Sequence, residues 1–502
     1  MDIRQFISYI NRAKGWHIEG HYYSYIDTWR QWWRGYYPDF HLVRYTGQDG
    51  NPHTRERYRL RMPKRLCEDW ASLLLNDKTT VTVDDEASAN WLCGGVDSQQ
   101  TGGLLGALDF WPNANRLVEL AFRSGTGAFV LSACDVSTQD GRLVATPGAS
   151  LALDYLPAEC ILPVTVQHGQ ITEVAFASEV TADGLSCVYL QTHRLVTSSD
   201  GVREYEITNE YYISDSEDSE GASYRPEKLP PGMLSRFRTG SARPWFAIFS
   251  PAAVKNLDGG PGLGVAVFAE ALDACRLVDL AFDNYCQDIL LGGKKVFYNR
   301  SMLKPILTPG GGTAYIAPDA LGNQLFWAGT EDMGGDDKPF WREYNPDLRT
   351  QSNGQAIQDA LNYASFLVGL GTHRYQFQAG TIATATQYMG DRQDMVQHAN
   401  RHQIAIEAAL RTLFGTLLWA GRALLGQPVN PDAAISIHFD DSYFDTAESR
   451  RQQDKDDCLS GFLPRYRYNM EWRGMSKEEA QAAVREAQEE LTAGPALTFG
   501  DV

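Results

Sequence analysis

Few residues in this sequence have the types and spacing that chemistry requires. His398 and His402 lie four positions apart, so on a helix the two imidazoles would share one face. Zinc sites of the HExxH type use this spacing but also need a glutamate after the first histidine. Alanine occupies position 399, so a polar helix face is the favoured interpretation and a metal site the alternative. His17 and His21 have the same spacing and the same interpretation.

A glycine-rich run at residues 259–264 would bind phosphate if it opened a helix, but a turn is the more common use of such a run. The phosphate-loop and GxSxG nucleophile patterns are absent. The pairs Asp440-Asp441 and Asp456-Asp457 offer acid and base groups, but the sequence does not set their separation. We expect a protein that is not an enzyme, with no catalytic residues, no metal and no cofactor; a catalytic triad assembled from distant positions is the alternative.

Arginine occupies every second position from Arg55 to Arg61. In a strand, these four side chains would point to one face. An ion-paired or solvated face is the favoured interpretation, and contact with a partner or a nucleic acid is the alternative.

Charge limits the classes of function. Among 502 residues, Lys and Arg number 45 and Asp and Glu number 63, which gives a net charge of −18. A protein that coats DNA is usually basic, so this balance argues against tight general binding to phosphates. It is compatible with a protein that lets DNA slide past. We expect no secretory signal and no membrane span, because the best apolar run, 404–425, carries charges and predicts a core or interface helix. The eight cysteines form no CxxC pair and predict reduced thiols.

The elements that position these residues predict an α+β fold. Trp29, Trp32 and Trp33 share one face of an N-terminal helix and are expected to be core or subunit interface. Helices and strands then alternate to about residue 250. A helix is predicted over 263–291, a β-rich insert over 292–352, a helix over 353–368, a loop over 369–383 and a long helix over 384–425. Two helices that bracket a β insert suit a subunit repeated around a ring, where each rod packs on its neighbours.

The C-terminal segment begins with a short strand pattern near residue 434 and is then mainly helical. Ser476 and Glu479 form the capping-box pattern that predicts the start of the final helix.

Several motifs occur together in an order that is typical of one family. They are Trp32-Trp-Arg-Gly35, Arg61-Met-Pro-Lys64, Gly262-Leu-Gly264-Val-Ala-Val-Phe, Thr384-Ala-Thr-Gln387 and Phe439-Asp-Asp-Ser442. In this order the chain resembles tailed-bacteriophage portal proteins of the Gram-positive-phage type, also called minor capsid or minor head proteins. Gln387 stands where the family has glutamate, which puts any role of that carboxylate in doubt.

The resemblance implies a homo-oligomeric ring, typically of twelve subunits, at one capsid vertex of the virion, assembled in the host cytoplasm. Double-stranded DNA would enter and leave through the ring. The implied partners are the terminase large subunit, a head-tail adaptor and the major capsid or scaffold proteins, with no membrane. The implied portal-like regions are an α+β wing over 1–262, a first stem helix over 263–291, a β-rich clip over 292–352, a second stem helix over 353–368, a tunnel loop over 369–383, a long wing helix over 384–425 and a helical crown over 426–502.

Two sets of residues are candidates for the DNA channel. The tunnel loop would touch phosphates through His373, Arg374, Gln376 and Gln378. The first stem helix would repel the DNA backbone through Glu270, Asp273, Asp279, Asp283 and Asp288, if they face the channel. A plain connection between helices is the alternative for the loop. For the whole chain, the alternatives are another structural head or neck protein and an acidic, tryptophan-rich hydrolase.

Overall fold

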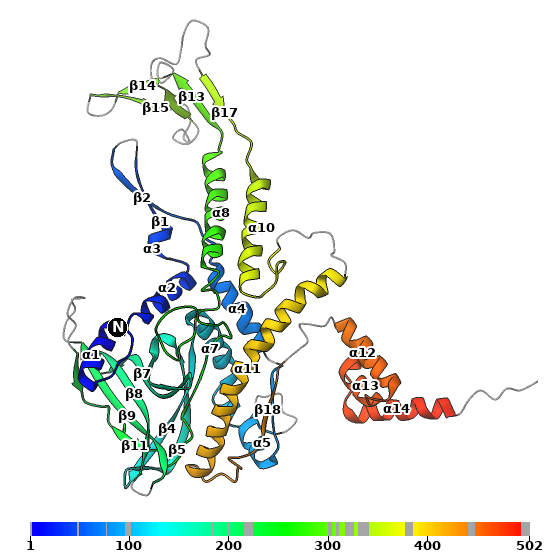
Figure 1. Ribbon diagram of the computed structural model, residues 1–502. Coiled ribbons are helices and arrows are strands. Elements are labelled where there is room, and N and C mark those ends of the chain that lie inside the picture. Colours follow the sequence, from blue (N-terminus) through cyan, green and yellow to red (C-terminus); the bar gives the residue numbers. More distant parts are fainter. Residues whose placement is uncertain are drawn as a thin grey trace, which may run out of the picture. The chain divides into compact units, whose positions relative to one another are not determined.

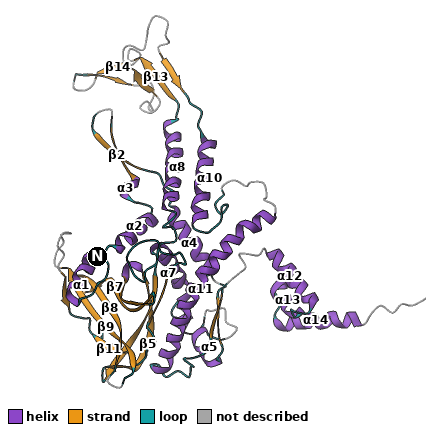
Figure 2. Ribbon diagram, in the orientation of Figure 1, coloured by secondary structure: helices purple, strands orange, loops and turns teal. Residues whose placement is uncertain are grey.

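The computed structural model of this chain divides into two units, Met1–His438 and Phe439–Val502. It describes residues 3–47, 50–76, 78–95, 102–182, 185–198, 201–214, 224–299, 304–307, 311–316, 326–329, 341–376, 385–439 and 447–492. A large curled mixed sheet is combined with long helices, which confirms the expected α+β class (Figure 2).

Nine strands form the sheet, in the order β12-β4-β5-β11-β9-β8-β7-β6 with β10 paired to β9. They are β4 (Gly127–Gln139), β5 (Arg142–Pro157), β6 (Ile161–Gln167), β7 (Gln170–Ala182), β8 (Leu185–Thr197), β9 (Arg203–Ser214), β10 (Tyr224–Glu227), β11 (Arg236–Arg238) and β12 (Phe246–Phe249). A short 3₁₀ turn, η1 (Ala158–Cys160), joins β5 to β6. Neighbouring strands are antiparallel, except that β11 meets β5 in parallel at Arg238 and Arg142.

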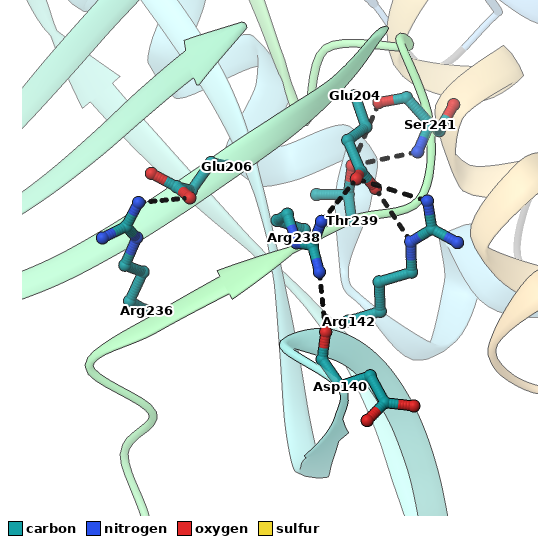
Figure 3. Close-up of polar contacts among 8 residues, drawn as sticks. All are labelled: Asp140, Arg142, Glu204, Glu206, Arg236, Arg238, Thr239 and Ser241. Carbon is teal, nitrogen blue, oxygen red and sulfur yellow. Dashed lines mark hydrogen bonds and ion pairs between the residues drawn. The ribbon is translucent and has the colours of Figure 1, made fainter. Parts of the chain in front are cut away.

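A buried carboxylate fixes this parallel junction. Glu204 of β9 is fully buried and pairs with Arg142 at 3.2 Å and with Arg238 at 3.3 Å (Figure 3). The Arg238 guanidinium also donates to the Asp140 carbonyl at 2.6 Å. A buried charge is tolerated only where it is paired, so these contacts specify which three strands meet here.

Helices cover the sheet, and the aromatic N-terminal segment forms the first of them. The first unit begins with α1 (Ile3–Lys14), α2 (Tyr22–Arg34), α3 (Pro38–His41) and the hairpin β1 (Leu42–Thr46) and β2 (Pro52–Glu56). Trp29 and Trp32 of α2 are 2% and 1% exposed, so these two tryptophans are core, as predicted, whereas Trp33 is only partly buried. Next come α4 (Met62–Leu74), β3 (Thr80–Val83), α5 (Glu86–Cys93), α6 (Gly103–Ala107) and α7 (Phe110–Ser124), which lies against β4 and β5.

Two antiparallel helices, α8 (Leu272–Leu291) and α10 (Thr350–Leu367), bracket an insert of short strands (Figure 1). The described strands of the insert are β13 (Lys295–Asn299), β14 (Lys304–Leu307), β15 (Thr313–Ile316), β16 (Phe326–Gly329) and β17 (Trp341–Tyr344). The helix pair is therefore observed, and α8 and α10 pack directly on each other.

The predicted start of the first of these helices at residue 263 is wrong, because α8 begins at Leu272. Backbone groups of the preceding segment bond to other elements: the Gly264 amide donates to Thr126 Oγ1 at 3.0 Å and the Val267 amide donates to the Phe122 carbonyl at 2.9 Å. Gly125 makes this approach possible, since a Cβ at that position would lie 2.2 Å from the Gly264 oxygen. These contacts replace helical hydrogen bonds.

The long helix expected over 384–425 is observed as α11 (Ala385–Ala423). Its segment Asp394–Ala423 is long and apolar enough to cross a membrane, yet 56% of its most apolar window is buried in the protein. Leu410, Phe414 and Leu417 are buried, so this part of α11 is a core helix, as the sequence indicated. After α11, β18 (Ile435–His438) pairs with β3.

The second unit contains α12 (Ala447–Ser460), α13 (Arg465–Arg473) and α14 (Lys477–Thr492). The predicted capping box at the start of α14 is confirmed: the Glu479 amide donates to Ser476 Oγ, and the Ser476 amide donates to Glu479 Oε2 at 2.9 Å. Because the first unit ends at His438, residues 426–438 belong with it and not with this helical unit.

Candidate functional site

Two of the five acids expected on a channel surface are buried in the monomer, so the prediction is wrong for Asp279 and Asp283. Each is 2% exposed and points from α8 toward the N-terminal segment. Asp279 accepts from the Leu60 amide at 2.8 Å and meets His41 Nε2 at 3.1 Å. Asp283 accepts two hydrogen bonds from Arg55. A buried carboxylate requires such partners, and these two hold the N-terminal hairpin region to α8.

Of the other three acids, Glu270 and Asp273 are exposed and Asp288 is half-buried, and all three have partners of their own. Glu270 precedes α8 and accepts from Asn256 Nδ2 at 3.1 Å, and Asp273 pairs with Arg276 at 2.8 Å. Asp288 receives hydrogen bonds from the Arg349 guanidinium and amide, which hold its pKa below the usual range. This pair joins the end of α8 to the start of α10.

The predicted loop begins with a tight exit from α10. Gly369 and Gly371 have φ values of +79° and +80°, and the Leu370 amide donates to the Ser365 carbonyl at 2.9 Å. His373, Arg374 and Gln376 follow and are solvent-exposed, with Gln376 Nε2 3.1 Å from His373 Nδ1. The fourth candidate, Gln378, lies outside the described residues. The three described candidates are thus brought together on one short exposed segment.

A carboxylate on α4 anchors this segment. Asp69 is 6% exposed and accepts a hydrogen bond from the Tyr375 hydroxyl at 2.6 Å. Its other oxygen lies 3.0 Å from Arg65 Nη2 and 3.7 Å from Arg374 Nη2. Burial and the hydrogen bond to Asp69 raise the pKa of Tyr375, so the phenol stays protonated and donates. The Gln358 side chain donates to the Tyr375 carbonyl, which fixes the segment against α10 as well.

Sequence reasoning did not single out Asp69, Tyr375 or Arg65 as parts of a site. One signal was present: Asp69 lies three residues after Leu66 and four before Leu73, on the apolar face of α4. A carboxylate on a buried helix face needs partners, so this position already indicated a buried polar contact. The identity of the partner, 306 residues further on, was not readable from the pattern.

The arginines between Arg55 and Arg61 make contacts within the chain. The strand β2 ends at Glu56, so the alternation does not continue along one strand as expected. Arg55 pairs with Asp283, Arg57 lies over the Phe40 ring at 4.7 Å and Arg59 lies over the Tyr36 ring at 4.9 Å. The favoured interpretation, a solvated or ion-paired face, is thus confirmed only in part: Arg55 and Arg59 form ion pairs, the second with Glu56 at 3.2 Å, whereas Arg57 packs on an aromatic ring.

His402 and the glycine-rich run have structural roles, and the Asp440-Asp441 pair lies outside the described residues. His402 is buried between the rings of Trp70 and Phe122, and its Nδ1 accepts from the Ala252 amide at 2.9 Å. Residues 259–264 form turns, and the Gly260 amide donates to Glu19 at 2.8 Å. No group of three His, Cys, Asp or Glu that could hold a metal occurs among the described residues, and no disulfide links the described cysteines.

One cavity of about 380 Å³ lies where α1 and α2 meet η1 and β7, and it is lined in part by acids. Asp27 pairs with Arg30 at 2.6 Å, Glu159 pairs with Arg123, and Glu179 accepts from a serine hydroxyl at 2.9 Å. Asp27 and Glu159 at this cavity are thus held in ion pairs, and Glu179 accepts a hydrogen bond from a neutral side chain.

Both helices of the α8–α10 pair expose large apolar side chains to solvent. The exposed fractions range from 38% to 61%. The residues are Leu277, Leu280, Ile289, Leu290 and Leu291 on α8, and Tyr363, Phe366 and Leu367 on α10. Apolar groups gathered on neighbouring helices are typical of a surface that another protein covers.

No family model and no curated protein matches this chain. Among solved structures, it is similar to a chain of the neck of a native GTA particle computed with C12 symmetry, at 12% identity and a TM-score of 0.33, over 81% of this chain and 88% of that chain. A chain from the virion of a native gene transfer agent (GTA) particle is 14% identical, with a TM-score of 0.32, over 82% and 89% of the two chains. A chain from the neck of an empty GTA particle computed with C6 symmetry is 12% identical, with a TM-score of 0.34, over 85% and 90%.

Proposed function

We propose that this chain is the portal protein of a tailed phage or a related particle. In this function it forms a ring, typically of twelve copies, at one capsid vertex, and double-stranded DNA is packaged and ejected through the ring. The order of the motifs from Trp32 to Ser442 supports the family resemblance. The arrangement of two antiparallel helices around a β insert supports the portal-like layout of stem and clip.

The observation that carries the proposal is the unpartnered apolar surface of the α8–α10 pair. Leu280 on α8 and Phe366 on α10 are 38% and 57% exposed, although both lie on helices that already pack on each other. A head-to-tail contact would bury α8 of one copy against α10 of the next, and such a contact closes into a ring when the rotation between copies is cyclic.

Charge and partners fit the same function. A net charge of −18 disfavours tight DNA binding over the whole surface, while the exposed segment from His373 to Gln376 offers light contacts to phosphate. In this proposal the β insert docks the terminase large subunit and then the head-tail adaptor. The α+β region meets the major capsid or scaffold proteins. The protein acts in the virion and needs neither a cofactor nor a catalytic residue.

Native mass tests the proposal directly. Mass photometry of the purified chain is expected to show a species near twelve times 56.0 kDa, roughly 670 kDa, or an adjacent ring size, and negative-stain images should show a central channel. A monomer or dimer at every concentration, both alone and together with the particle's capsid and scaffold proteins, would reject the portal function. An assembly without a central channel would support another structural head or neck protein instead.

A further inference from the structure

The arginine of the exposed segment after α10 lies close to a second arginine, on α4. Arg374 of this segment and Arg65 of α4 both approach the same oxygen of Asp69, at 3.7 Å and 3.0 Å. The side chains of these arginines are 35% and 57% exposed, whereas Asp69 is 6% exposed. Two cations that solvent can reach are therefore held side by side by one buried anion.

We propose that Arg65 and Arg374 form a phosphate-binding pair for double-stranded DNA, and that Asp69 limits the strength of that binding. This inference rests on the proposed function, because it assumes that DNA passes the segment. It adds a residue of α4 to the site and assigns the buried carboxylate a positioning role.

The geometry explains how the Asp69 carboxylate both orients the two arginines and reduces their affinity for phosphate. The Tyr375 hydroxyl donates to Asp69 Oδ2, so the loop segment is fixed to α4 while Oδ1 faces the two guanidinium groups. A DNA phosphate that approaches Arg65 or Arg374 must compete with that oxygen. Three charges then sum to +1, so the pair attracts the DNA backbone without holding it as two unpaired arginines would.

Neighbouring groups favour phosphate over other partners. His373 and Gln376 are exposed beside Arg374 and offer hydrogen bonds but no acidic group. Guanidinium groups in a fixed orientation are the side chains best matched to phosphate oxygens. Sequence-independent contacts of this kind carry affinity without base recognition, which suits DNA that moves.

Fluorescence anisotropy with a short, labelled, linear duplex of mixed sequence tests the pair on the assembled full-length protein over a range of salt. Arg65→Gln and Arg374→Gln are each expected to weaken binding about fivefold at low salt and to reduce the slope of log K against log salt by about 0.9 for each phosphate that the variant no longer neutralises. Arg12→Gln removes one charge from the exposed surface of α1 and is the matched control. Wild-type affinity and slope in both arginine variants would overturn the inference.

Asp69→Asn tests the limiting role, since the amide oxygen still accepts from Tyr375 while the charge is lost. Binding is expected to tighten about fivefold, with a steeper salt slope. Tyr375→Phe removes the hydrogen bond but keeps the carboxylate, so it should not tighten binding. A purely structural Asp69 would leave the salt slope unchanged, and that result would overturn its assigned role. Native mass separates the two proposals. A wild-type ring whose DNA binding does not depend on Arg65 and Arg374 refutes this inference alone, whereas failure of the wild-type chain to form a ring, both alone and with capsid and scaffold proteins, refutes the portal function.

Discussion

Arg55 and Asp283 form a bidentate ion pair that joins the N-terminal hairpin to the helix α8. The distances are 2.9 Å from Nη1 to Oδ1 and 2.8 Å from Nη2 to Oδ2. Burial disfavours the charge of Asp283, but hydrogen bonds from Arg55 and from the Tyr58 amide outweigh it and hold the pKa of Asp283 below its usual range. Helix α8 is thus held to a segment that lies more than 200 positions earlier in the chain.

Replacing Arg55 with alanine is expected to destabilise the first unit by about 3 kcal/mol, because Asp283 would keep its charge in a buried site with the Tyr58 amide as hydrogen-bond donor and only the more distant charge of Arg57. Arg55→Lys should recover part of the loss, since an ammonium restores the positive charge but not the two parallel hydrogen bonds of a guanidinium. Urea unfolding followed by tryptophan fluorescence measures the change. Arg44→Ala, at an exposed position of β1, is the control and should stay within about 0.5 kcal/mol of wild type. An equal effect of both alanine variants would show that the ion pair contributes nothing specific.

Two buried histidines predict a loss of stability in mild acid. Burial lowers the pKa of His193 to about 3, and burial together with nearby positive charge lowers the pKa of His402 to about 3. The unfolded chain takes up these protons near pH 6.5, while the folded chain does so only near pH 3. Stability is therefore expected to fall as the pH drops below about 6.5, by up to about 1.4 kcal/mol per pH unit for each histidine.

His402→Asn should flatten this decline, because an asparagine oxygen can still accept from the Ala252 amide but does not titrate. The measurement is the urea midpoint at several values between pH 7 and pH 4. His168→Asn is the control, since His168 is exposed and its positive φ suits asparagine. If His402→Asn and wild type lost stability in parallel, the histidine would not be a source of the acid sensitivity.

Replacement of Glu204 is expected to weaken the sheet locally, around β11. Replacing Glu204 with glutamine leaves the two partly exposed arginines, Arg142 and Arg238, without their anion and weakens their hydrogen bonds, so we expect a loss of about 1.5 kcal/mol. Hydrogen exchange should show faster exchange of the β11 amides, because β11 is short and meets β5 only at this junction. Glu227→Gln, in the exposed pair with Arg225, serves as the comparison and should leave β11 unchanged. Unchanged hydrogen-exchange protection of β11 in Glu204→Gln would show that the Glu204 ion pairs do not hold β11 in place.

The fold class and the order of helix, β insert and helix were predictable from the sequence, because periodic apolar positions and glycine-rich breaks report on local structure. The start of α8 was not. Residues 263–268 are apolar at helical spacing, but their backbone hydrogen bonds go to α7 and to Thr126, and no periodicity reveals a distant partner. Distant partners also explain the wrong prediction for Asp279. Its position in an acidic helix suggested a solvent-facing charge, whereas His41 and the Leu60 amide enclose it.

The loop candidates illustrate the opposite case. Composition alone placed His373, Arg374 and Gln376 in an acid-free, glycine-bounded segment, and the structure brings these three to one exposed surface. Asp69 completes the arrangement across a sequence separation of about 300 residues. Local sequence thus predicts which side chains a loop presents, but not the buried group that orients them.

The exposed apolar residues of α8 and α10 give a test of ring assembly that does not depend on DNA. Phe366→Asp and Leu280→Asp are expected to abolish the ring-sized species in mass photometry, because each would place a carboxylate in a desolvated contact between copies. Since both side chains are already exposed in the single chain, its circular dichroism and thermal midpoint should change little. Val202→Asp, at a 51% exposed position between β8 and β9, is the control and should assemble normally. Rings of wild-type mass and yield from both helix variants would exclude the α8–α10 surface as the contact, whereas disassembly together with unfolding would show that these side chains support the subunit itself.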